Sequence, residues 1–96
     1  MKNLALSLVV EFIGTFIFLS VILKTGEALP IAIALAAAIF FGGKYSGGNF
    51  NPAVSFMMYL NSKLDLQTMV AYILVQLIAG ACAYFFITNA NKNKLL

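Results

Sequence analysis

Long apolar runs, separated by short polar links, dominate the chain. Residues 4–23 form one such run with a single charge, residues 29–44 form a second, and residues 63–88 form a third. Pro30 is a residue type favoured in the first turn of a helix, which fits the start of the second run. At about 1.5 Å per residue, a helix of about twenty residues crosses the roughly 30 Å hydrocarbon core of a bilayer. The pattern therefore predicts three membrane-spanning helices.

Two local motifs add detail to the second and third spans. The small residues Ala34, Ala38 and Gly42 recur every four positions, a spacing that lets a second helix approach closely in a membrane. Ser62 and Asp65 have the spacing of a capping box, which predicts that this box opens the third span.

A short segment between the second and third spans does not fit a full crossing. Residues 42–50 are rich in glycine, and a nine-residue apolar stretch from Pro52 to Leu60 follows them. A helix of that length covers only about 13 Å, roughly half of the hydrocarbon core. We therefore expect residues 45–60 to form a re-entrant loop and half-helix, with the glycine-rich stretch entering as extended backbone against protein or a water-filled cavity.

Composition supports a membrane protein and excludes most other classes. Of 96 residues, 62% are hydrophobic and 9% are charged, against about 25% charged in typical soluble domains. The chain has one cysteine and no histidine, so we expect no metal site, no cofactor and no enzymatic activity. Its lysines are dispersed, which argues against nucleic-acid binding. The predicted fold is one all-α, multi-pass integral membrane domain over residues 1–96, with three transmembrane helices and one re-entrant half-helix.

The loop before the half-helix carries the candidate chemistry. Asn51 is expected at the N-terminus of the half-helix, where its oxygen can cap the helix and its NH2 group can donate to a solute. The carbonyls of Gly47, Gly48 and Asn49 can form a ladder of acceptors along a passage. The simpler interpretations are a plain helix cap and a plain turn.

Two polar residues lie inside the long spans. Glu11 is the only acid well inside a span, and an unpaired charge at the bilayer centre costs about 2.5–3.5 kcal/mol on insertion scales. We expect Glu11, with Gln76 of the third span, to support the re-entrant loop through its backbone N–H groups. The rival interpretation is that Glu11 carries protons.

Three segments together resemble the first half of the aquaporin/glycerol-facilitator family. They are Glu11-Phe-Ile-Gly-Thr, Ser46-Gly-Gly-Asn-Phe-Asn-Pro-Ala-Val-Ser and Tyr72-x-x-x-Gln76-x-x-x-Gly80-Ala. The resemblance implies a channel for water and small neutral solutes in which Asn51-Pro52-Ala53 lines the pore. Members usually carry two such halves, inverted relative to each other, whereas this chain has one.

The resemblance also implies where selectivity is set. Asn49 stands where a histidine is common, and Val54 follows the Asn-Pro-Ala triplet where the second half usually has arginine. Ile31 takes the place of an aromatic residue, and Ile39 with Gly48 completes the expected constriction. Without arginine, such an apolar ring should admit solutes of glycerol size.

One half cannot enclose a pore, so a partner is expected. Six lysines divide equally between the two predicted sides: Lys2, Lys44 and Lys63 against Lys24, Lys92 and Lys94. This lack of positive-inside bias predicts that identical chains insert both ways and pair antiparallel, with eight chains if four pores assemble as a tetramer. The alternatives are a non-conducting accessory half that pairs with a longer channel and a small proton-coupled transporter that uses Glu11.

Overall fold

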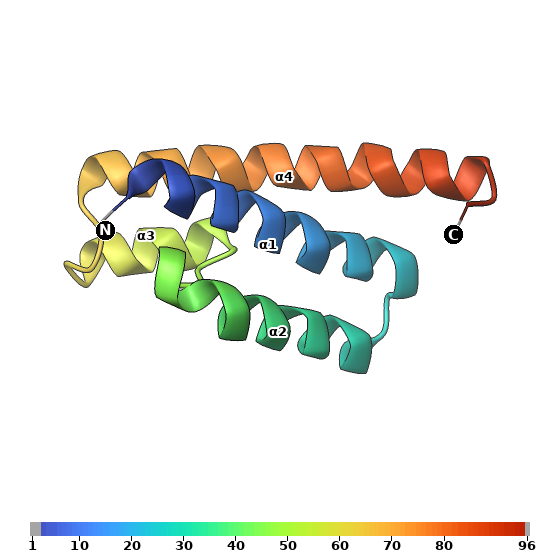
Figure 1. The fold of residues 1–96 in the computed structure, drawn as a ribbon, viewed down its shortest axis with the longest axis horizontal. Helices are drawn as coiled ribbons and strands as arrows, with labels where there is room; N and C mark the ends of the chain where they lie inside the picture. Colours follow the sequence, from blue (N-terminus) through green and yellow to red (C-terminus); the bar gives the residue numbers. More distant parts are fainter. Residues whose placement is uncertain (1–2, 96) are drawn as a thin grey trace.

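The chain folds into three long helices and one short one. A computed structural model describes residues 3–95, and Figure 1 shows its helices: α1 (Leu4–Thr25), α2 (Ala28–Ser46), α3 (Pro52–Leu60) and α4 (Leu66–Lys92). By length and hydropathy, α1, α2 and α4 can each cross a membrane. The predicted all-α class with three spans and one half-length helix is confirmed.

The helices pack around α1 and α4. Figure 1 shows α1 and α4 side by side, with α2 beneath α1, and the long dimension of the molecule is 43 Å. A bilayer with its headgroups measures about 40–45 Å. Within residues 3–95, α2 packs only on α1, and α3 packs only on α4. The short helix α3 runs back toward the end of the molecule at which α2 finishes, as a re-entrant element must.

The distribution of polar side chains is inverted relative to a protein that folds in water. Phe40, Phe41 and Phe85 are 79%, 71% and 62% exposed. Beside buried apolar residues, most of them on α4, the interior of the described chain holds an equal number of polar side chains, namely Ser7, Glu11, Thr15, Ser46, Asn49, Ser55 and Gln76. An apolar outside around a polar inside is stable when hydrocarbon is the solvent, because each buried polar group must then find a partner in the protein.

The glycine-rich stretch differs from its prediction. Gly42 and Gly43 do not break the helix, and α2 continues to Ser46. The non-helical segment is therefore shorter than expected, and Gly47, Gly48 and Phe50 have positive φ values rather than extended ones. Leaving a helix early inside a membrane would leave backbone groups unpaired, so glycine is tolerated within α2.

The predicted capping box is wrong. Ser62 lies in the turn after α3 with a φ of 61°, and Asp65 itself caps α4 by accepting a 2.8 Å hydrogen bond from the Thr68 backbone N–H. An Asp is at least as good a cap as a Ser, so the helix begins after the Asp. Hydrogen bonds from the Thr68 side chain and backbone lower the pKa of Asp65 below its usual value.

The lysines lie toward the two ends of the molecule. Lys24 Nζ donates to Asn91 Oδ1 at 3.1 Å, which joins the ends of α1 and α4. Lys44 lies in the last turn of α2, and Lys63 follows α3 toward the opposite end. Lys2 lies outside the described residues. The described lysines therefore leave neither end without positive charge.

Candidate functional site: the loop between α2 and α3

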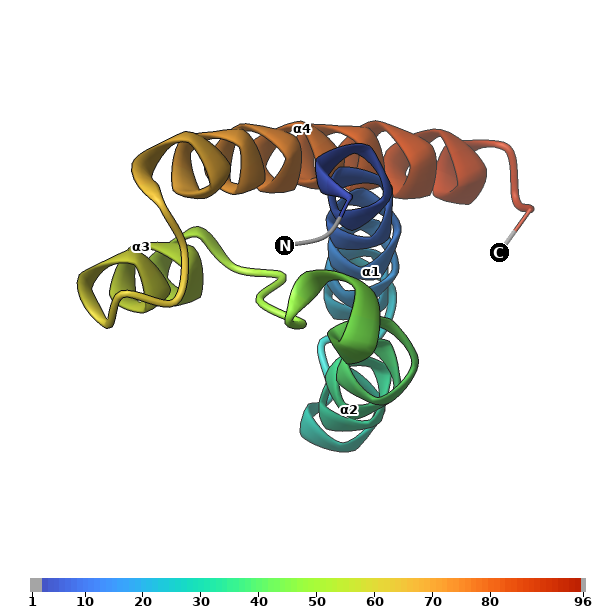
Figure 2. The same cartoon turned by 60° about the vertical axis from the view of Figure 1, so that its left-hand side comes forward.

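The loop consists of residues 47–51 and bends sharply into the molecule. Gly47 and Gly48 adopt φ values of 89° and 68°, which glycine reaches at little cost. The Gly47 N–H donates to Gly43 O at 2.7 Å and so closes the end of α2. Figure 2 shows the loop crossing from α2 to α3, which stand apart in that view.

The carboxylate of Glu11 is the centre from which the loop is held. Glu11 is 0% exposed. Its Oε2 accepts from Ser46 Oγ at 2.7 Å and from the Asn49 N–H at 3.0 Å. Its Oε1 accepts from the Phe50 N–H at 2.7 Å and from Gln76 Nε2 at 2.8 Å. Donors from α2, the loop and α4 therefore converge on one α1 side chain, and only its acceptor capacity is used.

A second polar link joins α4 to the half-helix. Gln76 Nε2 also donates to Ser55 Oγ at 2.8 Å, and Asn49 Nδ2 donates to the same hydroxyl at 2.9 Å. All three residues are buried. The side chain of Asn49 consequently points into the protein, so only its backbone remains for a solute.

The end of α2 is fixed by two hydroxyl groups. Tyr72 Oη donates to the Ser46 carbonyl at 2.6 Å, and Ser7 Oγ donates to the Tyr45 carbonyl at 2.8 Å. These carbonyls belong to the last turn of a helix, which has no intrahelical donors for them. The loop therefore starts from a fixed point.

Asn51 caps the start of α3, and within the described chain only the oxygen of its side-chain amide is hydrogen-bonded. Its Oδ1 accepts from the Ala53 N–H at 2.8 Å, and its backbone is extended as an N-cap requires. Asn51 is exposed, and within residues 3–95 no acceptor engages its Nδ2. Pro52 occupies the first turn of the helix. A free NH2 donor thus stands at the positive end of a helix dipole.

The N–H groups and the carbonyl groups of the loop backbone differ in their hydrogen bonding. The N–H groups of Asn49 and Phe50 are bonded to Glu11, and the N–H of Gly48 donates to Ser46 Oγ at 3.1 Å. The carbonyls of residues 47–50 accept no hydrogen bond from the described part of the chain. The loop therefore donates inward. Gly47 is exposed and Gly48 half-buried, so their carbonyls are the accessible acceptors, whereas Asn49 and Phe50 are buried.

The structure places the predicted constriction residues at different heights. A Cβ built on Gly48 would lie 3.5 Å from Ile39 Cγ2, so these two predicted residues lie together. Ile31 is eight residues earlier on α2, about 12 Å along the helix. Val54 and Ala53 lie in the first turn of α3 after Pro52, with Ala53 exposed.

Sequence reasoning missed several residues of this site. Ser46 and Ser55 are shared hydrogen-bond partners, Tyr72 donates to the Ser46 carbonyl, and Phe50 is almost fully buried. Ser46, Ser55 and Tyr72 all lie within the segments that carry the resemblance, which was the available signal. Phe50 lies in the same segment as Ser46 and Ser55, but its hydrophobic character alone does not indicate its position.

The sequence comparisons show clear similarity to a known family. Residues 7–95 match the family described as "Major intrinsic protein". The chain is 40% identical to the Glycerol uptake facilitator protein-like 6 of Lactiplantibacillus plantarum, with 76% of this chain and 38% of the relative covered. It is 33% identical to Aquaporin PIP1-3 of Arabidopsis thaliana, over 77% of this chain and 32% of the relative.

A human relative shows a similar level of identity and coverage. The chain is 32% identical to Aquaporin-10 of Homo sapiens, over 83% of this chain and 32% of that protein. No solved structure matches. The chain thus spans about a third of the length of the curated relatives that it matches.

Proposed function

Because the chain belongs to the major intrinsic protein family, we propose that it forms half of a passive channel for water and small neutral solutes such as glycerol. The observation that carries this proposal is the divided polarity of the loop. Glu11 and Ser46 accept from the N–H groups of Gly48, Asn49 and Phe50, whereas the carbonyls of residues 47–50 and the NH2 of Asn51 have no partner in the described part of the chain.

This arrangement suits a molecule that both donates and accepts hydrogen bonds. The loop carbonyls accept the hydrogens of water or of an alcohol, and Asn51 Nδ2 donates to its oxygen. The N-terminus of α3 carries roughly +0.5 of a charge, which repels cations while a neutral solute passes. Cation exclusion then needs no charged side chain in the passage.

We infer that the passage accepts solutes larger than water. The sequence contains no arginine or histidine. The residues assigned to its wall are Ile31 at one height, Ile39 with Gly48 at another about 12 Å away, and Val54 of α3. These residues are apolar or lack a side chain, so they match the carbon backbone of a polyol. Transport of glycerol as well as water follows from this assignment.

The burial of Glu11 favours a supporting role over proton coupling. Both of its oxygens are occupied by donors that belong to the loop and to α4, and none of the side chain is exposed. A proton carrier needs access to each side of the membrane in turn. The Glu11 and Gln76 pair instead has the geometry of a fixed brace.

A second half is needed to complete the passage. Gly47 and Asn51 are exposed, and α2 and α3 have no packed interface with each other in the described chain. Non-helical backbone at membrane depth is stable only against protein or a water-filled cavity. We propose that an inverted second copy covers the loop and places its own half-helix opposite α3, and that four such pairs assemble from eight chains.

The first test measures osmotic shrinkage of proteoliposomes that contain only this chain. We expect shrinkage faster than that of empty vesicles, with the low activation energy of a water-filled pore, and measurable glycerol uptake. Equal rates in protein-containing and empty vesicles, with the chain shown to be folded and paired, would rule out a self-sufficient pore. Activity that returns only with a longer family member would identify an accessory half instead.

The second test addresses antiparallel pairing through the lysines. One variant replaces Lys2, Lys44 and Lys63 by Gln, and a matched variant replaces Lys24, Lys92 and Lys94. Each variant should insert in one orientation and lose most water permeability in cells, because lysine bias sets orientation. Co-expression of the two should restore permeability. Full activity of either variant alone would contradict antiparallel pairing.

A further inference from the structure

Phe50, immediately before Asn51, has an uncommon combination of backbone and side-chain positions. Its φ is 55°, a region that bulky residues rarely adopt, and its side chain is 1% exposed. Its backbone N–H is bonded to Glu11 Oε1 at 2.7 Å. Such a backbone conformation persists only where surrounding contacts fix it, so the contacts of the Phe50 ring are expected to stabilise it.

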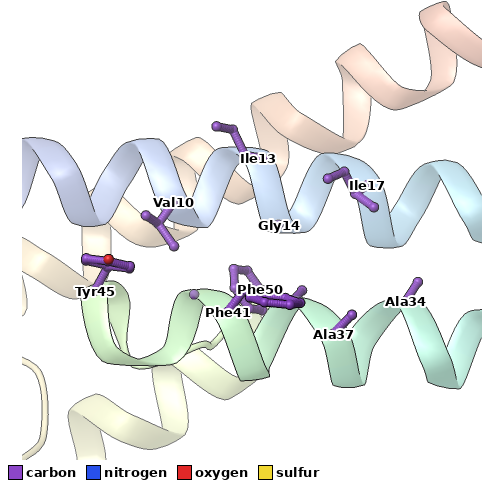
Figure 3. Close-up of a pocket in the computed structure, with 11 residues that line it drawn as sticks. Val10, Ile13, Gly14, Ile17, Ala34, Ala37, Phe41, Tyr45 and Phe50 are labelled. Carbon is purple, nitrogen blue, oxygen red and sulfur yellow. The ribbon is translucent and has the colours of Figure 1, made fainter.

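The ring is held between two glycines on different helices. A Cβ added to Gly14 of α1 would overlap Phe50 Cε1 and lie 2.7 Å from its Cζ. A Cβ added to Gly42 of α2 would lie 3.1 Å from the same Cζ atom and 2.9 Å from Val10 Cγ1. Figure 3 shows the ring of Phe50 facing Gly14 from the α2 side. The absence of both side chains is therefore what admits the ring.

The ring also borders an apolar groove on the outer side of α1 and α2. This groove has a volume of about 330 Å³, and its walls include Val10, Ile17 and Ala34 (Figure 3). The small residues that recur along α2, namely Ala34, Ala38 and Gly42, line this groove. The Phe50 ring is thus closely packed against Gly14 and Gly42 but borders the groove on another side. A small added side chain at either glycine can therefore displace the ring into the groove while α1 and α2 stay packed together.

We propose that Phe50 is a positioning residue whose ring, seated between Gly14 and Gly42, sets how far Asn51 projects into the passage and hence which solutes pass. The inference rests on the proposed function, because it assigns Asn51 to the passage. Gly14 meets one edge of the ring, formed by its Cδ1, Cε1 and Cζ atoms, so a methyl group there pushes the ring away from α1. One peptide bond transmits that displacement to Asn51, which narrows the passage.

The test combines a size increase at Gly14 with a size decrease at Phe50. In proteoliposomes, Gly14→Ala should lower the glycerol-to-water permeability ratio by about tenfold, as a loss of about 1.4 kcal/mol in barrier discrimination would do. Phe50→Leu in the Gly14→Ala background should restore the ratio to within about twofold of wild type. Gly43→Ala is the matched control, because nothing lies within 4 Å of a Cβ at that position.

A second readout does not depend on conduction. With Cys82→Ala as background, Ala53→Cys, two residues after Asn51, reports the accessibility of the loop by its rate of modification with a membrane-impermeant thiol reagent. Gly14→Ala should slow this rate, because a narrower passage admits the reagent less readily, and the added Phe50→Leu should return it. If Gly14→Ala fails to fold, Phe50→Leu alone should still change both the rate and the ratio.

The outcomes separate the inference from the proposed function. A wild-type chain that conducts neither solute contradicts the proposed function, whatever the thiol rates show. Unchanged rates and ratios in folded Gly14→Ala, or a double variant no closer to wild type than the single one, overturn the positioning role of Phe50 while leaving the channel intact.

Discussion

Glu11→Gln is expected to reduce water permeability to that of empty vesicles. The amide has one acceptor oxygen instead of two, so whichever way it turns, two of the four donors that converge on Glu11 lose their acceptor. Each buried donor left unpaired costs about 1–3 kcal/mol, which gives about 2–6 kcal/mol for the pair. The loop should detach from α1, and thermal unfolding in detergent should begin at a lower temperature.

Glu27→Gln provides the matched control. It makes the same chemical change at an exposed residue that forms no side-chain cap on α2. We expect wild-type permeability and unfolding temperature for it. A Glu11→Gln variant that stays as stable and as permeable to water as wild type, yet loses a proton-driven uptake, would instead identify Glu11 as a proton carrier.

Asn51→Asp is expected to alter conduction while leaving the fold intact. Asp caps a helix about as well as Asn, and its charge interacts favourably with the N-terminus of α3, so stability should not fall. The variant loses the free NH2 donor and places a negative charge where the helix end contributes roughly +0.5. We expect slower water and glycerol flux and a new cation or proton leak, measured with stopped-flow shrinkage and an entrapped pH dye.

Asn61→Asp is the control for that experiment. Asn61 caps the opposite end of the same half-helix and is also exposed, so the variant adds the same charge outside the proposed passage. Its conduction should match wild type. Equal conduction by Asn51→Asp and wild type would show that Asn51 only caps α3 and does not meet the solute.

Length and periodicity predicted the elements well because membrane thickness is a strong constraint. The half-helix expected to begin at Pro52 ends at Leu60 in the structure, and the three spans are present. The predicted end of the second helix at residue 44 was two residues early, because α2 continues to Ser46. In hydrocarbon the unpaired backbone costs more than the two adjacent glycines do, so the helix is not ended by them.

The polar cluster was only partly predictable. A carboxylate inside a span must find donors, so the need for partners around Glu11 follows from its position in the sequence. That Ser46 and Ser55 supply the remaining links depends on how α2 and α3 are oriented, and residues far apart in sequence meet there. The position of the Phe50 ring was not predictable, because the ring packs against glycines on two different helices. The positive φ of Phe50 also has no counterpart in the hydrophobic periodicity of the sequence.

The hydrogen bonds of Glu11 also bear on how the protein is made. The carboxylate belongs to α1, which leaves the ribosome before α4, and Gln76 lies 65 residues later in the chain. At about 5–20 residues per second, synthesis of that stretch takes on the order of 3–13 s. Three of its four donors arrive earlier, with Ser46, Asn49 and Phe50, and only the Gln76 donor waits for α4. Truncation before residue 46 should therefore leave the acid of α1 without any of these donors and α1 prone to leave the membrane, whereas truncation between residues 50 and 76 should weaken its hold less.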